Sequence, residues 1–385
     1  MKTFKRLISD NEWLYIRFQE NFGQFNIQLV LRGEGVVSGD DLKKALTISS
    51  ENQPISRAKK QGKFWIDTHQ VPEIIVHHDL LDLDSVLEHP VIQKPMPIDD
   101  HTVEIHFFNE GHLIVFQIFH GIMDGKGALM FVQNTFKALN GIQLDTINFC
   151  GSEVDFIQPL KVHQVPFGLK FKYNGINEYQ NPSKGNFAVK RLVIEGEIYQ
   201  LVPKLCQIFG HFSVDRESKW MIPVDIRRHR KGIIGDSNLT LPIFVHTNKE
   251  MTDRDIAGEY LFSLKENQEL NWNNVHIFGV SFGGKFMGKL WMRGLLSLQN
   301  MLKKFGISGL FSFLGKVNLR DFDVGKFMAT DFFAIPPYQP LAPFTMIAVL
   351  HEKTTELVIS YSTGYIRHEK MNQFLCELKS NLENE

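Results

Sequence analysis

The sequence predicts an α+β protein in which mixed or antiparallel sheets are flanked by helices. Strand-length apolar runs occur in both halves of the chain, without the regular strand–helix alternation that is typical of parallel α/β folds. Two pairs of these runs are separated by only a few turn-forming residues, which indicates antiparallel hairpins. The 385 residues exceed what one hydrophobic core usually spans, so we expect two lobes.

The first half of the chain carries one of the two hairpins. Its second strand is almost continuously apolar, which predicts burial on both faces. A helix then follows and stops before Gly141, a residue type that favours helix ends. The elements predicted here are strands at 25–31, 103–108 and 113–119, a helix beginning at Asp40 with an acidic first turn, and a helix at 128–139.

The second half closes with the other hairpin and a helix. The predicted elements are strands at 187–194, 221–227, 241–246, 344–350 and 356–361, and helices at 198–209, 295–302 and 368–382. Residues 166–186 are rich in Gly, Asn, Pro and Lys and show weak periodicity, so we expect them to link the lobes. The predicted lobes are therefore residues 1–165 and 187–385.

Composition indicates an ordinary globular protein, with 43 % hydrophobic and 22 % charged residues. The net charge of −1 argues against a nucleic-acid-binding protein, which would carry a basic excess. The charged N-terminus resembles no signal peptide, and no apolar run reaches the length of a membrane span, so we expect a cytoplasmic protein. The three cysteines are far apart and form no metal-binding spacing, so no metal site is predicted.

The most informative motif is His120-Gly-Ile-Met-Asp124-Gly125, which directly follows the predicted buried strand at 113–119. The shorter pattern HxxxD occurs three times, beginning at His78, His120 and His211, but only the middle copy continues with Gly. A histidine at the exit of a buried strand lies where a cleft can open. A lone histidine after an apolar strand is more often a hydrogen-bonded core residue, but the DG completion together with this position favours His120 as a catalytic base.

The residue types fit general acid–base catalysis by His120. A histidine with a pKa near ~6.5 is largely neutral at pH 7, so it can accept a proton from an attacking group and return it to a leaving group. The resemblance described below implies direct attack of an acceptor hydroxyl or amine on a thioester, so no covalent acyl-enzyme is expected. Gly125 is expected to allow a tight turn beside the site. No bound cofactor is predicted beyond the thioester co-substrate.

These motifs resemble the chloramphenicol acetyltransferase-like superfamily, which includes condensation domains, BAHD acyltransferases and bacterial alcohol acetyltransferases. Besides 120–125, the segment 223–227 with 235–238 is similar to the family's "PVxxR … GN" region, and 312–317 to a late "S-x-L-G" segment. Condensation domains usually carry a second histidine where this chain has Phe119, and the DFGWG motif of BAHD enzymes is missing, with Asp331-Phe-Phe-Ala in its place. The chain is most similar to stand-alone bacterial alcohol acetyltransferases.

The resemblance implies two similar lobes, arranged as a pseudo-dimer, with a tunnel at their interface and the motif midway along it. It also implies that Asp124 turns away from the base and pairs with an arginine, for which Arg227 is the candidate. Oxyanion stabilisation is expected from a backbone N–H or a hydroxyl of the second lobe, with Ser312 as a candidate.

The segment 270–320 contains no acidic residue and seven basic ones. It predicts either a solvated cationic face or a surface for an anionic partner. Lys303, Lys304 and Lys316 are the candidates for binding the phosphates of the acyl donor. Because both lobes come from one chain, we expect a monomer.

Three functions remain open. The first is an acyltransferase that uses acyl-CoA and a small alcohol or amine. The second is a condensation-like catalyst that takes acyl groups from a carrier protein docked on 270–320. The third is a non-catalytic binding module with the same fold.

Overall fold

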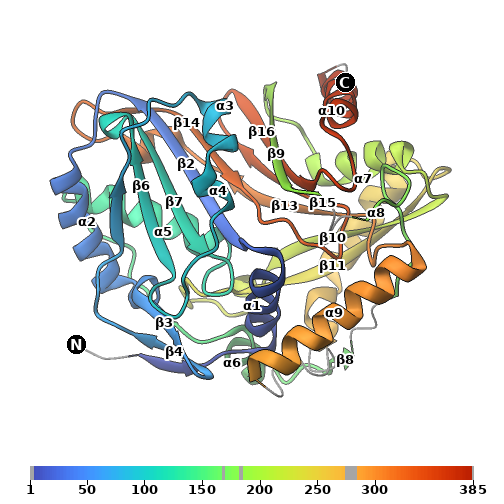
Figure 1. Cartoon of the computed structure of the whole chain (residues 1–385), viewed down its shortest axis with the longest axis horizontal. Helices are drawn as coiled ribbons and strands as arrows, with labels where there is room; N and C mark the ends of the chain where they lie inside the picture. Colours follow the sequence, from blue (N-terminus) through green and yellow to red (C-terminus); the bar gives the residue numbers. More distant parts are fainter. Residues whose placement is uncertain (1–3, 167–169, 182–184, 274–283, 384–385) are drawn as a thin grey trace.

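Two large β-sheets, one built mainly from each half of the chain, form the centre of the protein (Figure 1). The computed structural model describes residues 4–166, 170–181, 185–273 and 284–383. Parts of the predicted linker 166–186 and of the acid-free segment 270–320 lie outside these described residues.

The first sheet has five strands in the order β14-β2-β7-β6-β5. Its strands are β2 (Asn26–Glu34), β5 (Glu73–Val76), β6 (Val103–Phe108), β7 (Leu113–Phe119) and β14 (Met328–Ile335). All pairs are antiparallel except β5 with β6. Every residue of β7 is buried, which confirms the prediction from its continuous apolar run.

The second sheet has six strands in the order β11-β10-β13-β15-β16-β9. Its strands are β9 (Phe187–Glu195), β10 (Glu217–Asp225), β11 (Thr240–Asn248), β13 (Gly309–Lys316), β15 (Phe344–Leu350) and β16 (Thr354–Ser362). β13 runs parallel to both neighbours and the other pairs are antiparallel, so this sheet is mixed. Two small sheets add β1 (Lys5–Leu7), β3 (Ala58–Gln61), β4 (Phe64–Asp67), β8 (Val165–Pro166) and β12 (Trp272–Asn273).

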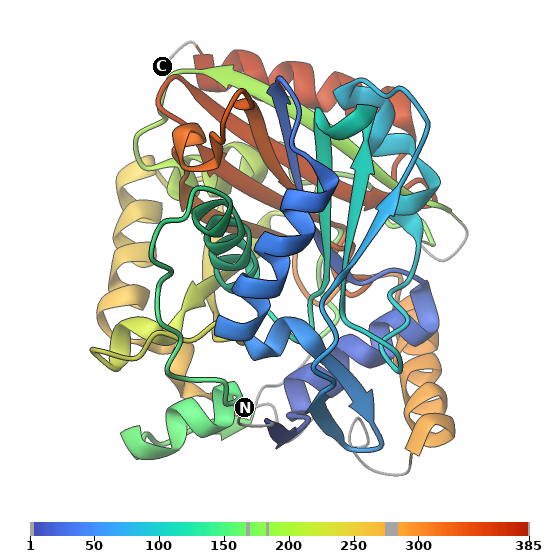
Figure 2. The ribbon, with the colours of Figure 1, turned by 90° about the vertical axis from the view of Figure 1, so that its left-hand side faces the viewer.

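Helices cover both sheets, and Figure 2 shows α2 and α5 side by side in front of the five-stranded sheet. The helices are α1 (Asp10–Phe22), α2 (Gly39–Asn52), α3 (Leu83–Glu88), α4 (Pro90–Gln93), α5 (Gly125–Leu139), α6 (Glu153–Ile157), α7 (Leu201–Phe212), α8 (Asp253–Lys265), α9 (Gly284–Leu302) and α10 (His368–Glu383). Side-chain caps begin several of them; Ser9 and Glu12, for example, form a reciprocal capping box at α1.

The main hydrophobic core crosses between the two sheets. It joins β2, β6 and β7 to Ile347 and Val349 of β15 and Val358 of β16. A second core fills the space between the six-stranded sheet and helices α7 and α10. The sheets flanked by helices confirm the predicted α+β class.

The structure corrects several local predictions. The helix expected at 198–209 begins at Leu201, because Gln200 is in the left-handed region. Arg227 lies in a short 3-10 helix (Ile226–His229) rather than at a strand end, and the Asp225 side chain accepts the Arg227 N–H there. Helices α1 and α8 and strand β14 were not predicted.

Strand β14 comes from the second half of the chain but pairs with β2 of the first sheet. The division into lobes at 1–165 and 187–385 stays a prediction, and β14 is a point at which the second half enters the sheet of the first. Among the described residues, no helix combines the length and apolarity needed to cross a bilayer.

Candidate active site

His120 lies at the end of β7, directly after the last residue of the strand. Its backbone N–H donates to the carbonyl of Phe25 at 3.1 Å, which ties the turn to the start of β2. Its ring stacks on Tyr15, with ring centroids 4.9 Å apart, and on Phe25 at 5.8 Å. The ring is therefore held in one orientation between α1 and β2.

The hydrogen bonds of His120 define which ring nitrogen carries the proton. Nδ1 lies 3.2 Å from the carbonyl oxygen of Met123. A carbonyl can only accept, so Nδ1 is the protonated nitrogen of the neutral ring. Nε2 then holds a lone pair and has no hydrogen-bond partner within the described chain. Burial lowers the pKa of His120, which keeps the ring neutral.

Asp124 turns away from the base and begins helix α5. Its side chain accepts from the Gly127 N–H at 2.8 Å as an N-cap. It also accepts from the Leu239 N–H and the Thr240 hydroxyl, each at 2.8 Å. Burial alone would raise the pKa of Asp124, but Arg227 and these donors outweigh it, so the pKa is lowered and the carboxylate is ionised.

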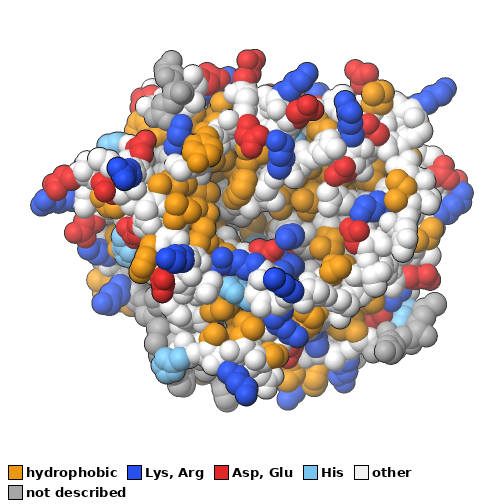
Figure 3. Space-filling model, turned by 180° about the vertical axis from the view of Figure 1, so that it is seen from behind, with side chains coloured by type: hydrophobic (Ala, Val, Ile, Leu, Met, Phe, Trp, Pro, Cys, Tyr) orange, Lys and Arg blue, Asp and Glu red, His pale blue; other side chains and the backbone are white. Residues whose placement is uncertain are grey.

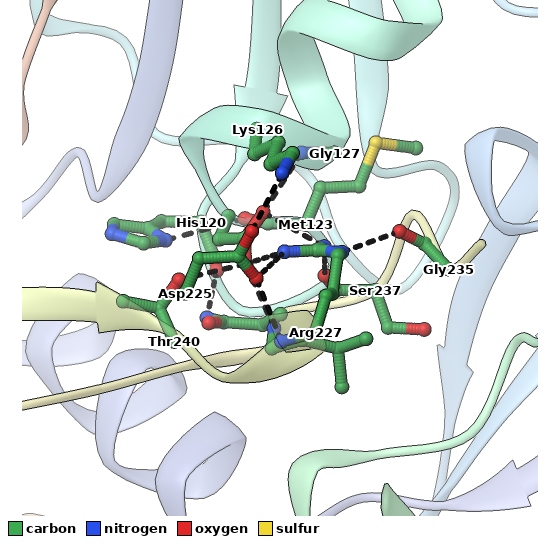
Figure 4. Close-up of polar contacts among 12 residues, drawn as sticks. His120, Met123, Lys126, Gly127, Asp225, Arg227, Gly235, Ser237 and Thr240 are labelled. Carbon is green, nitrogen blue, oxygen red and sulfur yellow. Dashed lines mark hydrogen bonds and ion pairs between the residues drawn. The ribbon is translucent and has the colours of Figure 1, made fainter. Parts of the chain in front are cut away.

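Arg227 uses all five of its guanidinium N–H groups (Figure 4). Two bond to Asp124, with nitrogen–oxygen distances of 2.9 and 3.1 Å. The others bond to Asp225 and to the carbonyls of Gly235 and Ser237. Arg227 thus holds the HxxxDG loop of the first half against residues 225–237 of the second.

A further contact joins the same two segments on the His120 side. The Asn238 side-chain amide donates to the His120 carbonyl at 2.8 Å. Thr240, two residues later, holds Asp124 as described. The segment Gly235 to Thr240 therefore clamps both ends of the motif, which keeps the imidazole and the start of α5 in fixed relative positions.

A cavity of about 100 Å³ opens beside His120, between the two sheets. His120, Asp124 and Gly125 line it from the first half of the chain, and Ser312 and Thr345 from the second. Most of the lining is apolar, and it includes Pro223, Pro242, Pro336 and Pro337. Such a lining excludes water and suits an acyl chain.

Thr345 is the most unusual polar group of this lining. The residue is 4 % exposed, and its Oγ1 is buried without a hydrogen-bond partner. Ser312 lies on the neighbouring strand, since β13 pairs with β15 and Ser312 is opposite Ile347. Three hydroxyl-bearing residues of the second sheet therefore line the cavity, namely Thr240, Ser312 and Thr345, and the Thr240 hydroxyl is already bonded to Asp124.

Gly125 is placed differently from the sequence-based expectation. The turn spans residues 120–122, and Gly125 is the first residue of α5, without a positive φ. A Cβ there would lie 3.1 Å from Leu314 Cδ1. A larger residue would make the Leu314 side chain of β13 shift slightly, so the glycine fits the close approach of β13 rather than a tight turn.

The three candidate lysines are not part of this cavity lining. Lys316 forms an ion pair with Glu197 at 2.7 Å, and Lys304 lies 3.7 Å from Asp215. Lys303 directly follows α9, where its side chain is exposed and its backbone is in the left-handed region. Their predicted role in donor binding stays a prediction.

Sequence reasoning missed Tyr15, Phe25, Asn238 and Thr345. Phe25 and Asn238 lie in segments that the sequence did single out, but nothing there indicated contact with His120. Tyr15 lies in the unpredicted helix α1. Thr345 is one of several hydroxyls in apolar strands, and its missing partner is visible only in three dimensions.

Comparison with known proteins places the fold. No known family model and no curated protein sequence matches this chain. Solved structures do match: the condensation domain from monacolin K polyketide synthase MokA aligns over 100 % of this chain and 97 % of its own, with a TM-score of 0.62 and 11 % identity.

Two other similar structures are condensation domains of synthetases. One is the starter condensation domain of rhizomide synthetase RzmA, in a mutant form in complex with C8-CoA and Leu-SNAC. It aligns with a TM-score of 0.63 at 10 % identity, over 99 % of this chain and 95 % of its own. The first condensation domain of the calcium-dependent antibiotic synthetase, in complex with a substrate analogue, has a TM-score of 0.61 at 12 % identity, covering 98 % and 97 %. This chain therefore has the two-lobed condensation-domain fold over its full length.

Proposed function

We propose that the protein is an acyltransferase that moves an acyl group from a thioester to an alcohol or amine, with His120 as the general base. The observation that carries this proposal is the unprotonated Nε2 of His120, which lines an apolar cavity between the sheets of a condensation-domain fold. Both halves of the site belong to one chain, so we expect a monomer to be active.

His120 serves as base and then as acid in the proposed reaction. The acceptor hydroxyl or amine attacks the thioester carbonyl carbon while Nε2 takes its proton. The tetrahedral intermediate then collapses, the carbon–sulfur bond breaks, and Nε2 returns the proton to the thiolate. The hydrogen bond from Nδ1 to Met123 stabilises the imidazolium that forms between the two steps.

Charge that develops on the thioester oxygen needs a donor on the other side of the cavity. Thr345 and Ser312 are our candidates, because both line the cavity from the second sheet. Thr345 is favoured, since its buried Oγ1 lacks a partner and a hydrogen bond to the oxyanion would satisfy it.

We propose acyl-CoA as the donor. The face in Figure 3 carries a hollow bordered by hydrophobic side chains, with Lys and Arg side chains gathered nearby, a combination that suits an apolar acyl chain and anionic phosphates. The similar RzmA domain is described with C8-CoA. A carrier-bound donor is the second candidate, because the similar structures are domains of multi-enzyme synthetases.

The first test is thiol release from acyl-CoAs of increasing chain length, with and without a mixture of alcohols and amines. We expect release by the wild type, increased by some acceptors, and a loss of about 10²–10⁴-fold in His120→Ala. His78→Ala is the matched control, because it removes the exposed histidine of another HxxxD copy and should leave the rate unchanged.

The outcomes separate the candidates. No release from any CoA, together with transfer from an acyl carrier protein, would favour the carrier-bound donor. Equal rates for wild type and His120→Ala would show that His120 is not the base. Inactivity with every donor would favour the non-catalytic module.

A further inference from the structure

We propose that His77, Asp79 and His89 form a structural binding site for a divalent transition-metal ion of the zinc type. One ligand atom from each side chain lies within 4.8 Å of the others. His77 directly follows β5, Asp79 lies in the next loop, and His89 is the N-cap of α4. Figure 1 marks this segment by the labels α3 and α4.

A hydrogen-bonded chain behind His77 fixes its tautomer. The Gln117 amide donates to the carbonyls of Val91 and Lys94, so its oxygen faces His106 and accepts from His106 Nε2 at 3.2 Å. Glu104 lies 3.3 Å from the same nitrogen and can also only accept. His106 Nε2 therefore carries the proton, and its Nδ1 accepts.

The donor to His106 Nδ1 is His77 Nε2, at 3.0 Å. His77 Nδ1 is then left with a lone pair, the state in which imidazole binds a metal. Metal-bound histidines usually donate their other N–H to a carboxylate, a backbone carbonyl or water, which fixes the orientation of the ring. Here the His106 ring takes that place, and its own N–H faces the Gln117 oxygen and Glu104.

The other two ligands are close to one another. His89 Nε2 lies 3.7 Å from an oxygen of Asp79. Ligand atoms around a tetrahedral zinc are roughly 3.3 Å apart, given bonds of about 2.0 Å. The Asp79 side chain is 62 % exposed, so it can rotate to close this gap.

Binding at His89 Nε2 has an identifiable cost. His89 Nδ1 accepts from the Val91 N–H at 3.3 Å, so Nε2 carries the proton of the neutral ring in the absence of an ion. An ion at Nε2 moves that proton to Nδ1 and releases this contact. At 3.3 Å this contact is long for a hydrogen bond. Losing it therefore costs little free energy compared with what the new metal bonds contribute.

The loop that carries Asp79 is held in place from behind. The Asn109 side chain accepts from the Leu81 N–H at 2.8 Å and donates to its carbonyl at 2.7 Å. The cluster is also remote from the candidate active site. His106 pairs with Val115, five residues before His120, which corresponds to roughly 17 Å along β7. We therefore assign the ion a stabilising role.

Two imidazoles and one carboxylate, completed by water, form a donor set that zinc accepts. The rings also pack on Phe108, with His77 stacked at 4.3 Å and His89 edge-on at 5.1 Å. Packing of the imidazoles without an ion is the alternative that an experiment has to separate.

The test is zinc titration of the tag-free, chelator-treated full chain, by competition with a chromophoric chelator. We expect one zinc ion per chain and an affinity that falls roughly 10- to 100-fold or more in Asp79→Asn. The zinc affinity of His89→Asn should fall similarly, although its Asn side chain can still cap α4. His78→Ala removes an exposed neighbour outside the cluster and should bind as the wild type does.

Thermal unfolding gives an independent readout. At the same zinc concentration, zinc should raise the Tm of the wild type and of His78→Ala more than that of Asp79→Asn, because an ion bound to the folded state stabilises it according to its affinity. Equal affinity in the wild type and Asp79→Asn, or an equal loss in His78→Ala, would overturn the proposal in favour of ring packing or surface binding.

Discussion

His120 is the residue on which the proposed chemistry depends, and its surroundings set the pH at which it works. Burial between Tyr15 and Phe25 lowers its pKa below the ordinary value of 6.5. A general base acts in its neutral form, so a lowered pKa extends activity to lower pH.

We therefore expect the acid limb of kcat/KM to lie below pH 6.5. Product formation from an acyl thioester should be measured by mass spectrometry across pH 5 to 8, because thiol reagents respond to pH themselves. An acid limb at or above pH 6.5 would contradict the assignment of His120 as the titrating base.

Arg227 is the residue that holds the motif, and its removal should act on stability. In Arg227→Met the Asp124 carboxylate stays buried without its main partner. Breaking a buried pair in this way typically costs about 3–5 kcal/mol. Urea denaturation should show this loss of unfolding free energy. The double variant with Asp124→Asn should lose less than the sum of the two single variants.

Arg216→Met is the matched control for this prediction. Arg216 pairs with Glu250 at 3.2 Å, but both side chains are largely exposed, at 84 % and 77 %. Exposed ion pairs contribute little to the free energy of unfolding, so the urea midpoint of this variant should hardly change. Equal effects of both substitutions would show that the Asp124–Arg227 pair is no more than a surface interaction.

At the scale of elements, the start of α5 packs against residues 235–240, the segment that follows the 3-10 helix of Arg227. This contact fixes the position of the HxxxDG motif relative to the second sheet. Gly127 lies in the first turn of α5, where a Cβ would come 2.0 Å from the Asp236 carbonyl oxygen. The clash would be with the backbone of Asp236, not with a side chain that can rotate away. Relieving it would shift either α5, which begins after Asp124, or the segment that carries Asn238.

We expect Gly127→Ala to destabilise the protein by about 1–3 kcal/mol, the usual cost of overpacking. Gly258→Ala in α8 is the control, since no atom lies within 4 Å of the added Cβ. That substitution should be neutral or stabilise by about 0.4–1 kcal/mol. Chemical denaturation of both variants tests the contrast, and similar losses would refute the close approach of α5.

At the scale of the whole molecule, Asp236 links stability to pH. It is fully buried, and one oxygen has no partner while the other lies 3.4 Å from the Gln53 amide. Burial raises the pKa of Asp236 to about 7. Between pH 4 and 7 the folded state therefore keeps a proton that the unfolded state has lost, so stability falls as pH rises, by about 1.4 kcal/mol per unit.

Asp236→Asn should remove this dependence. Relative to the wild type, the variant should gain unfolding free energy as pH rises from 5 to 8, because its amide has no charge to bury. Urea denaturation at several pH values measures the difference. Parallel curves for the two proteins would show that Asp236 does not titrate in this range.

Much of the local structure could be predicted from the sequence. The strands at 103–108 and 113–119 lie where the apolar runs are, because local hydrophobic pattern reports burial directly. The fold class followed from how these strands are connected. Helix α1 was missed because its buried positions include Glu12 and Arg17, which weaken the apolar pattern.

The sequence by itself determined the α+β class and the two hairpins, and it supplies the prediction that His120 is the functional copy among three HxxxD patterns. Only the tertiary structure decided that Tyr15 stacks on that histidine, that β14 joins the first sheet, and that His77, Asp79 and His89 converge. These features depend on contacts between segments far apart in the chain. Hydrophobic periodicity reports which side of an element is buried, but not which element buries it.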